Sequence, residues 1–190
     1  DKGDTGDTGP AGAGGITTAT TAKQEGQVLE MLTGLCDGRS VIAKSGTYSL
    51  QNVTSALYLT SSYQDLTGSE ISYKPPTGTR YVIYSFKYYQ TFDANSSAYS
   101  NAGIQLLIDN TVQVEPEMVG VDQYGDKYVT VSWTIEISGS TNTDAVSLNA
   151  WSSTKTLKLQ ARERATNRQG IIHMANYTTD QIGGGGNAAT

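Results

Sequence analysis

Glycine recurs at every third position of the first fifteen residues, and this spacing constrains the chain more than any other feature. The glycines in register are Gly3, Gly6, Gly9, Gly12 and Gly15. Polyproline II geometry has about three residues per turn, so all of them lie along one edge of the chain. Three such chains can wind together only if the edge facing the common axis carries no side chain. The run therefore predicts a collagen-like stalk shared by three copies of the chain, a homotrimer; the alternative is a flexible glycine-rich linker.

The remainder of the 190 residues has the size and composition of one β-rich domain. We expect a stalk end at 1–15, a polar neck at 16–27, a head domain at 28–180 and a glycine-rich tail at 181–190. Because the chain begins inside the repeat and without Met, we also expect it to be the C-terminal part of a longer protein.

Charge and hydropathy argue against several partners. The net charge of −5 disfavours non-specific binding to nucleic acid, which needs basic side chains to neutralise phosphates. No apolar run approaches the ~20 residues of a membrane span, and no signal peptide is visible. Cys36 is the only cysteine, so an intrachain disulfide is excluded.

Two stretches alternate between apolar and polar residues as half-buried strands do. Over 80–92 the pattern places Val82, Tyr84, Phe86 and Tyr88 on one face of a strand. Over 128–138 it predicts that five apolar side chains point into a core: Val129, Val131, Trp133, Ile135 and Ile137. One dry face and one wet face are typical of an antiparallel sheet.

Shorter strands are expected at 40–43, 47–50, 56–60, 70–74, 104–108, 111–114, 145–151, 156–164 and 171–175. Asp109-Asn110 has the residue types of a hairpin turn, and 93–101 is expected to be a polar loop. The apolar run at 28–32 fits either a strand or a single helical turn. About ten to twelve short strands without a long helix predict an all-β fold, an antiparallel β-sandwich or jelly roll.

A collagen-like run leading into such a head resembles the trimeric C1q/TNF-like architecture, which also occurs on viral and bacterial fibres. More narrowly, 71–86 (ISYKPPTGTRYVIYSF), 104–111 (IQLLIDNT) and 157–163 (LKLQARE) resemble a β-domain carried by collagen-like proteins of aquatic viruses, including phages and large algal or protist viruses. The resemblance covers most of 26–180. It implies a trimeric fibre or spike head on the virion surface and brings no catalytic motif.

The residue types that usually carry catalysis are sparse, and we expect no enzyme activity and no cofactor. His173 is the only histidine and stands in an apolar run, which favours a structural or interface role. Cys36 lacks a nucleophile motif, and one Cys with one His cannot supply a zinc site. Glu115, Glu117 and Glu163 are scattered carboxylates without the paired arrangement of a glycosidase.

A few residues remain as binding candidates. Asp122 and Asp126 flank a glycine turn and form a weak calcium candidate, for which the alternative is a hairpin turn with solvated acids. Arg162 and Arg164 belong to the one basic cluster, which suits an anionic glycan, a solvated strand face or an ion pair between subunits. Tyr81 and Tyr89 are candidates for a trimer or ligand surface, unless they simply populate strands. Sequons begin at Asn52, Asn95 and Asn176 and matter only in a eukaryotic secretory route.

Three functions follow as expectations. The first is a trimeric, non-enzymatic virion fibre or spike head that attaches to a host glycan or protein and joins other virion proteins through the upstream stalk. The second is a purely structural trimerising cap or capsid-decoration protein. The third is a cellular C1q/TNF-like binding module.

Overall fold

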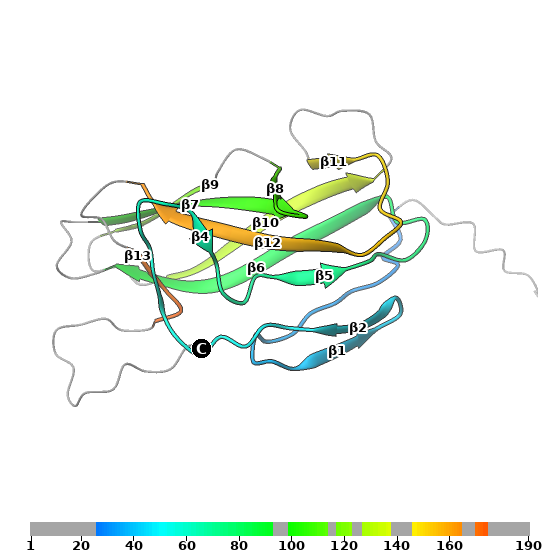
Figure 1. Cartoon of the computed structure of the whole chain (residues 1–190), viewed down its shortest axis with the longest axis horizontal. Helices are drawn as coiled ribbons and strands as arrows, with labels where there is room; N and C mark the ends of the chain where they lie inside the picture. The colour runs from blue at the N-terminus through cyan, green and yellow to red at the C-terminus, as the bar shows by residue number, and fades with distance from the viewer. Residues whose placement is uncertain are drawn as a thin grey trace, which may run out of the picture.

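The computed structural model describes residues 26–92, 99–113, 117–122, 127–137, 146–164 and 170–174. The regular elements in these ranges are thirteen β-strands (Figure 1). The prediction of an all-β chain is confirmed. No helix able to cross a membrane occurs in the described ranges.

Eleven of the strands form two large sheets. One sheet has the order β11 (Val146–Leu148), β10 (Lys127–Ile137), β6 (Tyr81–Phe92), β13 (Gly170–Ile172), β3 (Leu57–Tyr58). The other has β4 (Gln64–Asp65), β12 (Lys155–Glu163), β7 (Tyr99–Ile108), β8 (Thr111–Val112), with β5 (Ile71–Tyr73) on β12 and β9 (Glu117–Asp122) on β7. The pairs are antiparallel, as predicted, except that β10 and β11 run parallel.

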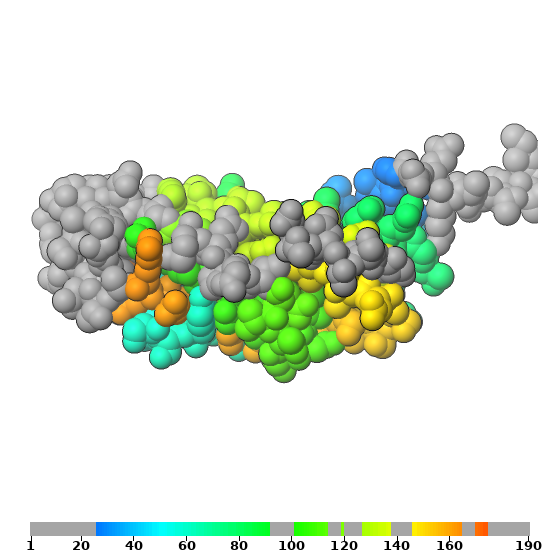
Figure 2. All heavy atoms as spheres, turned by 90° about the horizontal axis from the view of Figure 1, so that it is seen from above, coloured from blue at the N-terminus to red at the C-terminus, as the bar shows by residue number. Residues whose placement is uncertain are grey.

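The remaining two strands make a separate hairpin. β1 (Ser40–Ala43) and β2 (Gly46–Ser49) pair only with each other and form a sheet of their own (Figure 1). The hairpin contacts the body through the buried Tyr48, whose ring packs on Tyr73 of β5. In the space-filling view the body is elongated, and the blue atoms of the N-terminal segment lie toward one end (Figure 2). The described part of the chain therefore enters at one end of a sandwich.

The two large sheets share one hydrophobic core. Phe86 and Val131 contribute to it from the first sheet, and Leu106 and Leu159 from the second. Three of the five side chains predicted to point inward on β10 are buried, namely Val129, Val131 and Ile135. Trp133 and Ile137 are half-buried and pack against the same core. The alternation of apolar and polar residues along β10 therefore matches its two faces.

The hairpin turn at Asp109-Asn110 is confirmed. β7 pairs with β8 across it, with Ile108 opposite Thr111. Both turn residues have left-handed backbone angles, with φ of 50° at Asp109 and 64° at Asn110. Asn and Asp tolerate this region better than other residues with side chains, which explains why they occupy the turn.

Several local predictions are wrong. Residues 28–32 form neither a strand nor a helical turn, because no strand in the described ranges pairs with them. The predicted loop at 93–101 is too long, since β7 begins at Tyr99. β4 and β9 are additional strands. The hairpin weighed for Asp122 and Asp126 does not form, because β9 pairs with β7 in one sheet and β10 pairs with β6 in the other; residues 123–126 lie outside the described residues.

Candidate functional site: an open strand edge and its groove

Strand β6 is paired on both sides only near its C-terminal end. β10 runs beside it from Tyr81 to Gln90, whereas β13 pairs with Gln90, Thr91 and Phe92 alone. No strand in the described ranges pairs with the other side of β6 from Tyr81 to Ser85. A central strand of the sandwich therefore has an open edge over most of its length.

The ladder shows which residues carry the open main-chain groups. Ile137 N donates to Arg80 O at 2.8 Å, so the even-numbered residues of β6 exchange hydrogen bonds with β10. On the other side His173 N donates to Tyr89 O at 2.9 Å, which shows that odd-numbered residues point away from β10. Tyr81, Ile83, Ser85 and Lys87 thus direct their N–H and C=O groups to the open edge.

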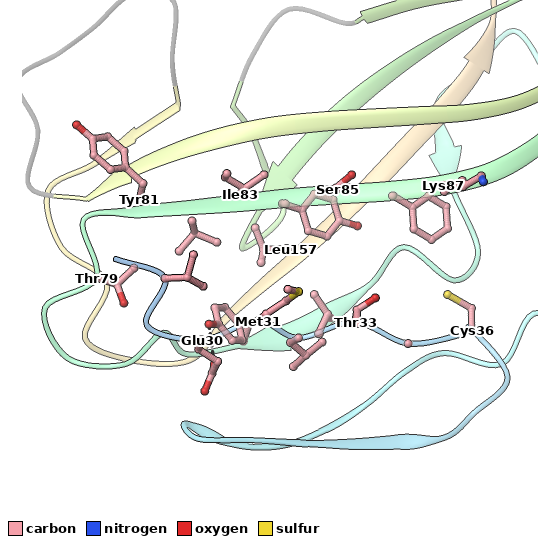
Figure 3. Close-up of a pocket in the computed structure, with 18 of the residues that line it drawn as sticks. Glu30, Met31, Thr33, Cys36, Thr79, Tyr81, Ile83, Ser85, Lys87 and Leu157 are labelled. Carbon is pink, nitrogen blue, oxygen red and sulfur yellow. Dashed lines mark hydrogen bonds between the residues drawn. The ribbon is translucent and has the colours of Figure 1, made fainter. Parts of the chain in front are cut away.

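A groove of about 1680 Å³ lies between this edge and the N-terminal segment 26–36. Tyr81, Ile83, Ser85 and Lys87 line the β6 side, and Glu30, Met31, Thr33 and Cys36 stand on the opposite side (Figure 3). The groove reaches the core, because Tyr84, Phe86, Ile71 and Leu157 also line it. It is a long, mainly apolar opening into the space between the two sheets.

Large apolar side chains around the groove are exposed. The exposed fraction is 75% for Val28, 75% for Met31 and 71% for Ile83. Leu35, Tyr81 and Tyr128 are also exposed. Single exposed apolar residues are ordinary, but a group of them beside an open strand edge is typical of an interaction site.

One carboxylate fixes the N-terminal segment. Glu30 accepts hydrogen bonds from Ser45 N (2.6 Å), Ser45 Oγ (2.6 Å) and the Tyr73 hydroxyl (2.9 Å). Burial acts to raise the pKa of Glu30, but these hydrogen bonds outweigh it and hold the pKa below its usual range. Burial and the bond to Glu30 raise the pKa of Tyr73. Glu30 therefore joins the segment to the β1–β2 turn and to β5.

Cys36 closes the far end of the segment. Its thiol donates to Gly68 O at 3.2 Å and is half-buried, and burial raises the pKa of the Cys36 thiol. Gly68 has a φ of 89°, and a Cβ there would lie 2.6 Å from Val53 Cγ2, so only glycine fits. These contacts give Cys36 a structural role at this end of the segment.

His173 is buried at the closed end of the groove. Its Nε2 lies 2.8 Å from Thr67 O, and its ring packs edge-on against Phe86 and Tyr88. Burial lowers the pKa of His173, and the bond to Thr67 offsets this only in part. A neutral histidine that packs against two aromatic rings fits the structural role expected from the sequence.

The four candidates for a trimer or ligand surface fall in two places. Tyr81 is exposed on the groove, and the Tyr89 ring packs 4.9 Å from the ring of Tyr128 beside it. Arg162 lies on β12 in the other sheet, with its guanidinium 4.9 Å from the Tyr63 ring centroid. Arg164 is exposed just beyond the end of β12. The two tyrosines therefore lie on the sheet that contains β6, whereas Arg162 and Arg164 lie on or beside β12 in the other sheet.

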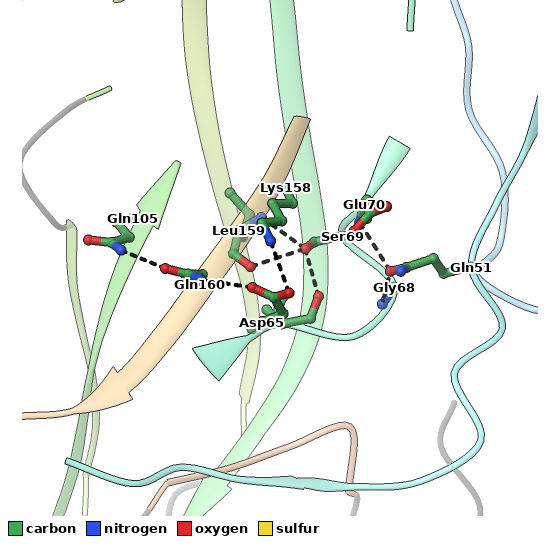
Figure 4. Close-up of polar contacts among 10 residues, drawn as sticks. Gln51, Asp65, Gly68, Ser69, Glu70, Gln105, Lys158, Leu159 and Gln160 are labelled. Atoms are coloured by element: carbon green, nitrogen blue, oxygen red, sulfur yellow. Dashed lines mark hydrogen bonds and ion pairs between the residues drawn. The ribbon is translucent and has the colours of Figure 1, made fainter. Parts of the chain in front are cut away.

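The outer face of the second sheet is polar, and its groups bond one another. Asp65 accepts from Lys158 Nζ (3.0 Å) and Gln160 Nε2 (2.8 Å), and Gln160 in turn accepts from Gln105 Nε2 (2.8 Å) (Figure 4). Burial acts to raise the pKa of Asp65, but these partners lower it overall. The network links β4, β12 and β7.

The remaining candidate residues lie only partly within the described ranges. No group of three or more His, Cys, Asp or Glu side chains in the described ranges could hold a metal ion. Asp122 ends β9, Glu117 begins it and Glu163 ends β12. Asp126, Glu115 and the glycines Gly3, Gly6, Gly9, Gly12 and Gly15 lie outside the described residues.

Comparison of the chain with protein-family models, with curated proteins and with solved structures finds no match. The open edge of β6 was missed by sequence reasoning, because alternation along a strand does not report which neighbours pair with it. The sequence did contain one feature that could have pointed to this site, the apolar run at 28–32, which pairs with no strand in the described ranges.

Proposed function

We propose that this chain is the head of a trimeric, non-enzymatic virion fibre or spike that attaches to a glycan or protein on the host surface. The observation that supports it best is the order of the chain. A run with glycine at every third position leads, ten residues later, into a β-sandwich whose described part begins at Gly26, on the groove. The glycine register implies three associated chains, so three heads share one stalk.

The virion part of the proposal comes from the resemblance of residues 71–86, 104–111 and 157–163. These stretches supply β5, most of β12 and part of β7, which are neighbours in one sheet, together with part of β6. The resembling residues thus form a contiguous part of the head, as expected if they belong to one domain type. Three heads on one stalk would also strengthen a weak contact of each head with a host surface.

The second candidate is a purely structural cap that registers and ends the stalk. The polar face around Asp65 favours it, because Gln105, Lys158 and Gln160 use their hydrogen-bonding groups on one another. Such a face offers fewer groups to a glycan than a face with open donors and acceptors. A test of binding to host glycans would therefore distinguish a head that attaches to the host from a head that only caps the stalk.

The first test is the solution mass of the chain by light scattering, with and without residues 1–15. We expect a trimer for the full chain, and a monomer would overturn the proposal. The second test is binding to an array of host-surface glycans and to host cells. Binding that Tyr63→Ala weakens and Tyr81→Ala leaves unchanged would place attachment on the Arg162 face. No binding by a trimeric chain would favour the structural cap.

A further inference from the structure

We propose that a second copy of this chain completes each head: its residues 28–35 lie along the open edge of β6 as an added strand and fill the groove. The inference rests on the proposed trimer and names the contact between its heads. It is a heterologous contact, in which the segment of one copy meets the β6 edge of the next, and three such contacts close a ring.

The β6 edge has the properties of a strand acceptor. Tyr81, Ile83, Ser85 and Lys87 direct main-chain N–H and C=O groups toward the groove, and no described residue hydrogen-bonds to those groups. An added strand would satisfy them with main-chain hydrogen bonds, the recognition mode known as β-augmentation. A long apolar edge without a cover also invites uncontrolled pairing, and folded proteins avoid it by covering the edge.

The segment 28–35 has the properties of a strand donor. In an extended chain Leu29, Met31 and Leu35 share one face. Val28 and Leu32 share the other face with Glu30, whose carboxylate is already bonded to Ser45 and Tyr73. Apolar residues on both faces suit a strand that is buried on both sides, as the groove between β6 and the core would bury it. The segment contains no proline, so every residue can donate its N–H.

The stalk supplies the second copy. The glycine register holds three parallel chains at one axis, and its last glycine is Gly15. Ten residues, 16–25, separate it from Gly26, and Gly26 and Gln27 line the groove. The segments of the other two copies therefore begin within a short tether of each groove, which gives them a high effective concentration there. An unrelated peptide would have no such advantage.

Cross-linking of paired cysteines in the full chain tests the contact. The sole native cysteine is first removed by Cys36→Ser. One chain then carries Met31→Cys and a second, with a tag of different size, carries Ile83→Cys; the two are co-expressed and treated with a short bis-maleimide. We expect a covalent product that contains both tags. The control pair replaces Met31→Cys with Val112→Cys, which is exposed on β8 in the other sheet, and should give no such product.

A proline substitution tests the main-chain pairing. The N–H of Ser85 points to the open edge, so Ser85→Pro removes one donor from the groove and none from the β6–β10 ladder. Ser132 is the residue directly opposite on β10, and its N–H points away from β6, so Ser132→Pro is the matched control. We expect Ser85→Pro to reduce the yield of the cross-linked product that contains both tags at least about fivefold, and Ser132→Pro to leave that yield unchanged. The urea unfolding midpoint of both variants should stay near that of the parent chain.

The outcomes separate this contact from the trimer itself. A monomeric full chain in light scattering would overturn both proposals. A trimer without the mixed product, or with a product that Ser85→Pro does not reduce, would overturn the added strand alone. A chain carrying both Met31→Cys and Ile83→Cys that cross-links only within itself would also overturn it, because the groove would then be closed by its own segment.

Discussion

The strongest test of how the N-terminal segment is held concerns Glu30. Replacing Glu30 with Ala removes an acceptor of three hydrogen bonds, two from Ser45 and one from Tyr73. Hydrogen bonds to a charged group contribute roughly 1.5–3 kcal/mol each when shielded from water. Glu30 is only half-buried, so water replaces part of what is lost, and we expect about 2 kcal/mol for the whole set.

A loss of about 2 kcal/mol corresponds to roughly a thirtyfold larger population in which the segment is detached. The detachment is local, because β1 and β2 pair only with each other and the sandwich core lies elsewhere. We therefore expect amide hydrogens around Ser45 to exchange about thirtyfold faster in Glu30→Ala, with little change in the urea midpoint. Glu30→Gln keeps one oxygen acceptor, so its amide exchange rate around Ser45 should lie between the rates of the parent chain and of Glu30→Ala.

The same contact predicts a pH dependence. Because the pKa of Glu30 is lowered in the folded chain, its contribution is present above the ordinary value of 4.5 and is lost as the pH falls through the folded pKa. Protection around Ser45, compared with the unfolded peptide at each pH, should decrease over that acidic range. Glu136→Ala on β10 is the control. An acceleration of less than about threefold in Glu30→Ala would refute the assignment of the segment's attachment to this carboxylate.

Three further outcomes are expected. Leu159→Ala should lower the free energy of unfolding in urea by about 3–5 kcal/mol, because Leu159 is 0% exposed in the core that the two sheets share. Lys158→Ala on the outer face should lower that free energy by less than about 1 kcal/mol. Asn110→Val should lower it by about 1–2 kcal/mol, since φ is 64° there and a β-branched residue disfavours that region. Cys36 should react with Ellman's reagent at least about tenfold more slowly in the folded chain than in urea, because burial raises its pKa; equal rates would contradict its contact with Gly68.

The parts of the fold that could be predicted are those whose signal is local. The alternation along β10 reports which side chains face the core, because the sheet buries one face only. The Asp109-Asn110 turn is also local, since its left-handed angles select its residue types. Trp133 shows the limit of such signals: its face was predicted, but its half-buried state depends on tertiary packing that alternation along one strand does not report.

The parts that could not be predicted depend on distant pairing. β4 has two residues and exists because Gln64 and Asp65 lie opposite β12. A strand was expected at 171–175, but β13 ends at Ile172 because His173 takes a φ of 64° and packs its ring against Phe86. The groove also depends on pairing between residues that are distant in the sequence. It exists because β13 is too short to cover β6, and neither strand carries that information in its own residues.

The separate β1–β2 hairpin has a mechanical consequence. If the chain is the head of the proposed stalk, tension along that stalk would reach the described residues at Gly26. Ser40 and Ser49 lie opposite each other at the open end of the hairpin. A force that separates Ser40 from Ser49 breaks the hydrogen bonds of the hairpin one after another. A force along the axis of paired strands is instead carried by all of their hydrogen bonds together. The hairpin would therefore unzip at low force and release chain, at about 3.3–3.6 Å per residue, before the sandwich bears the load. In the proposed fibre head, the hairpin would extend by a few nanometres under a sudden pull while the core stays intact.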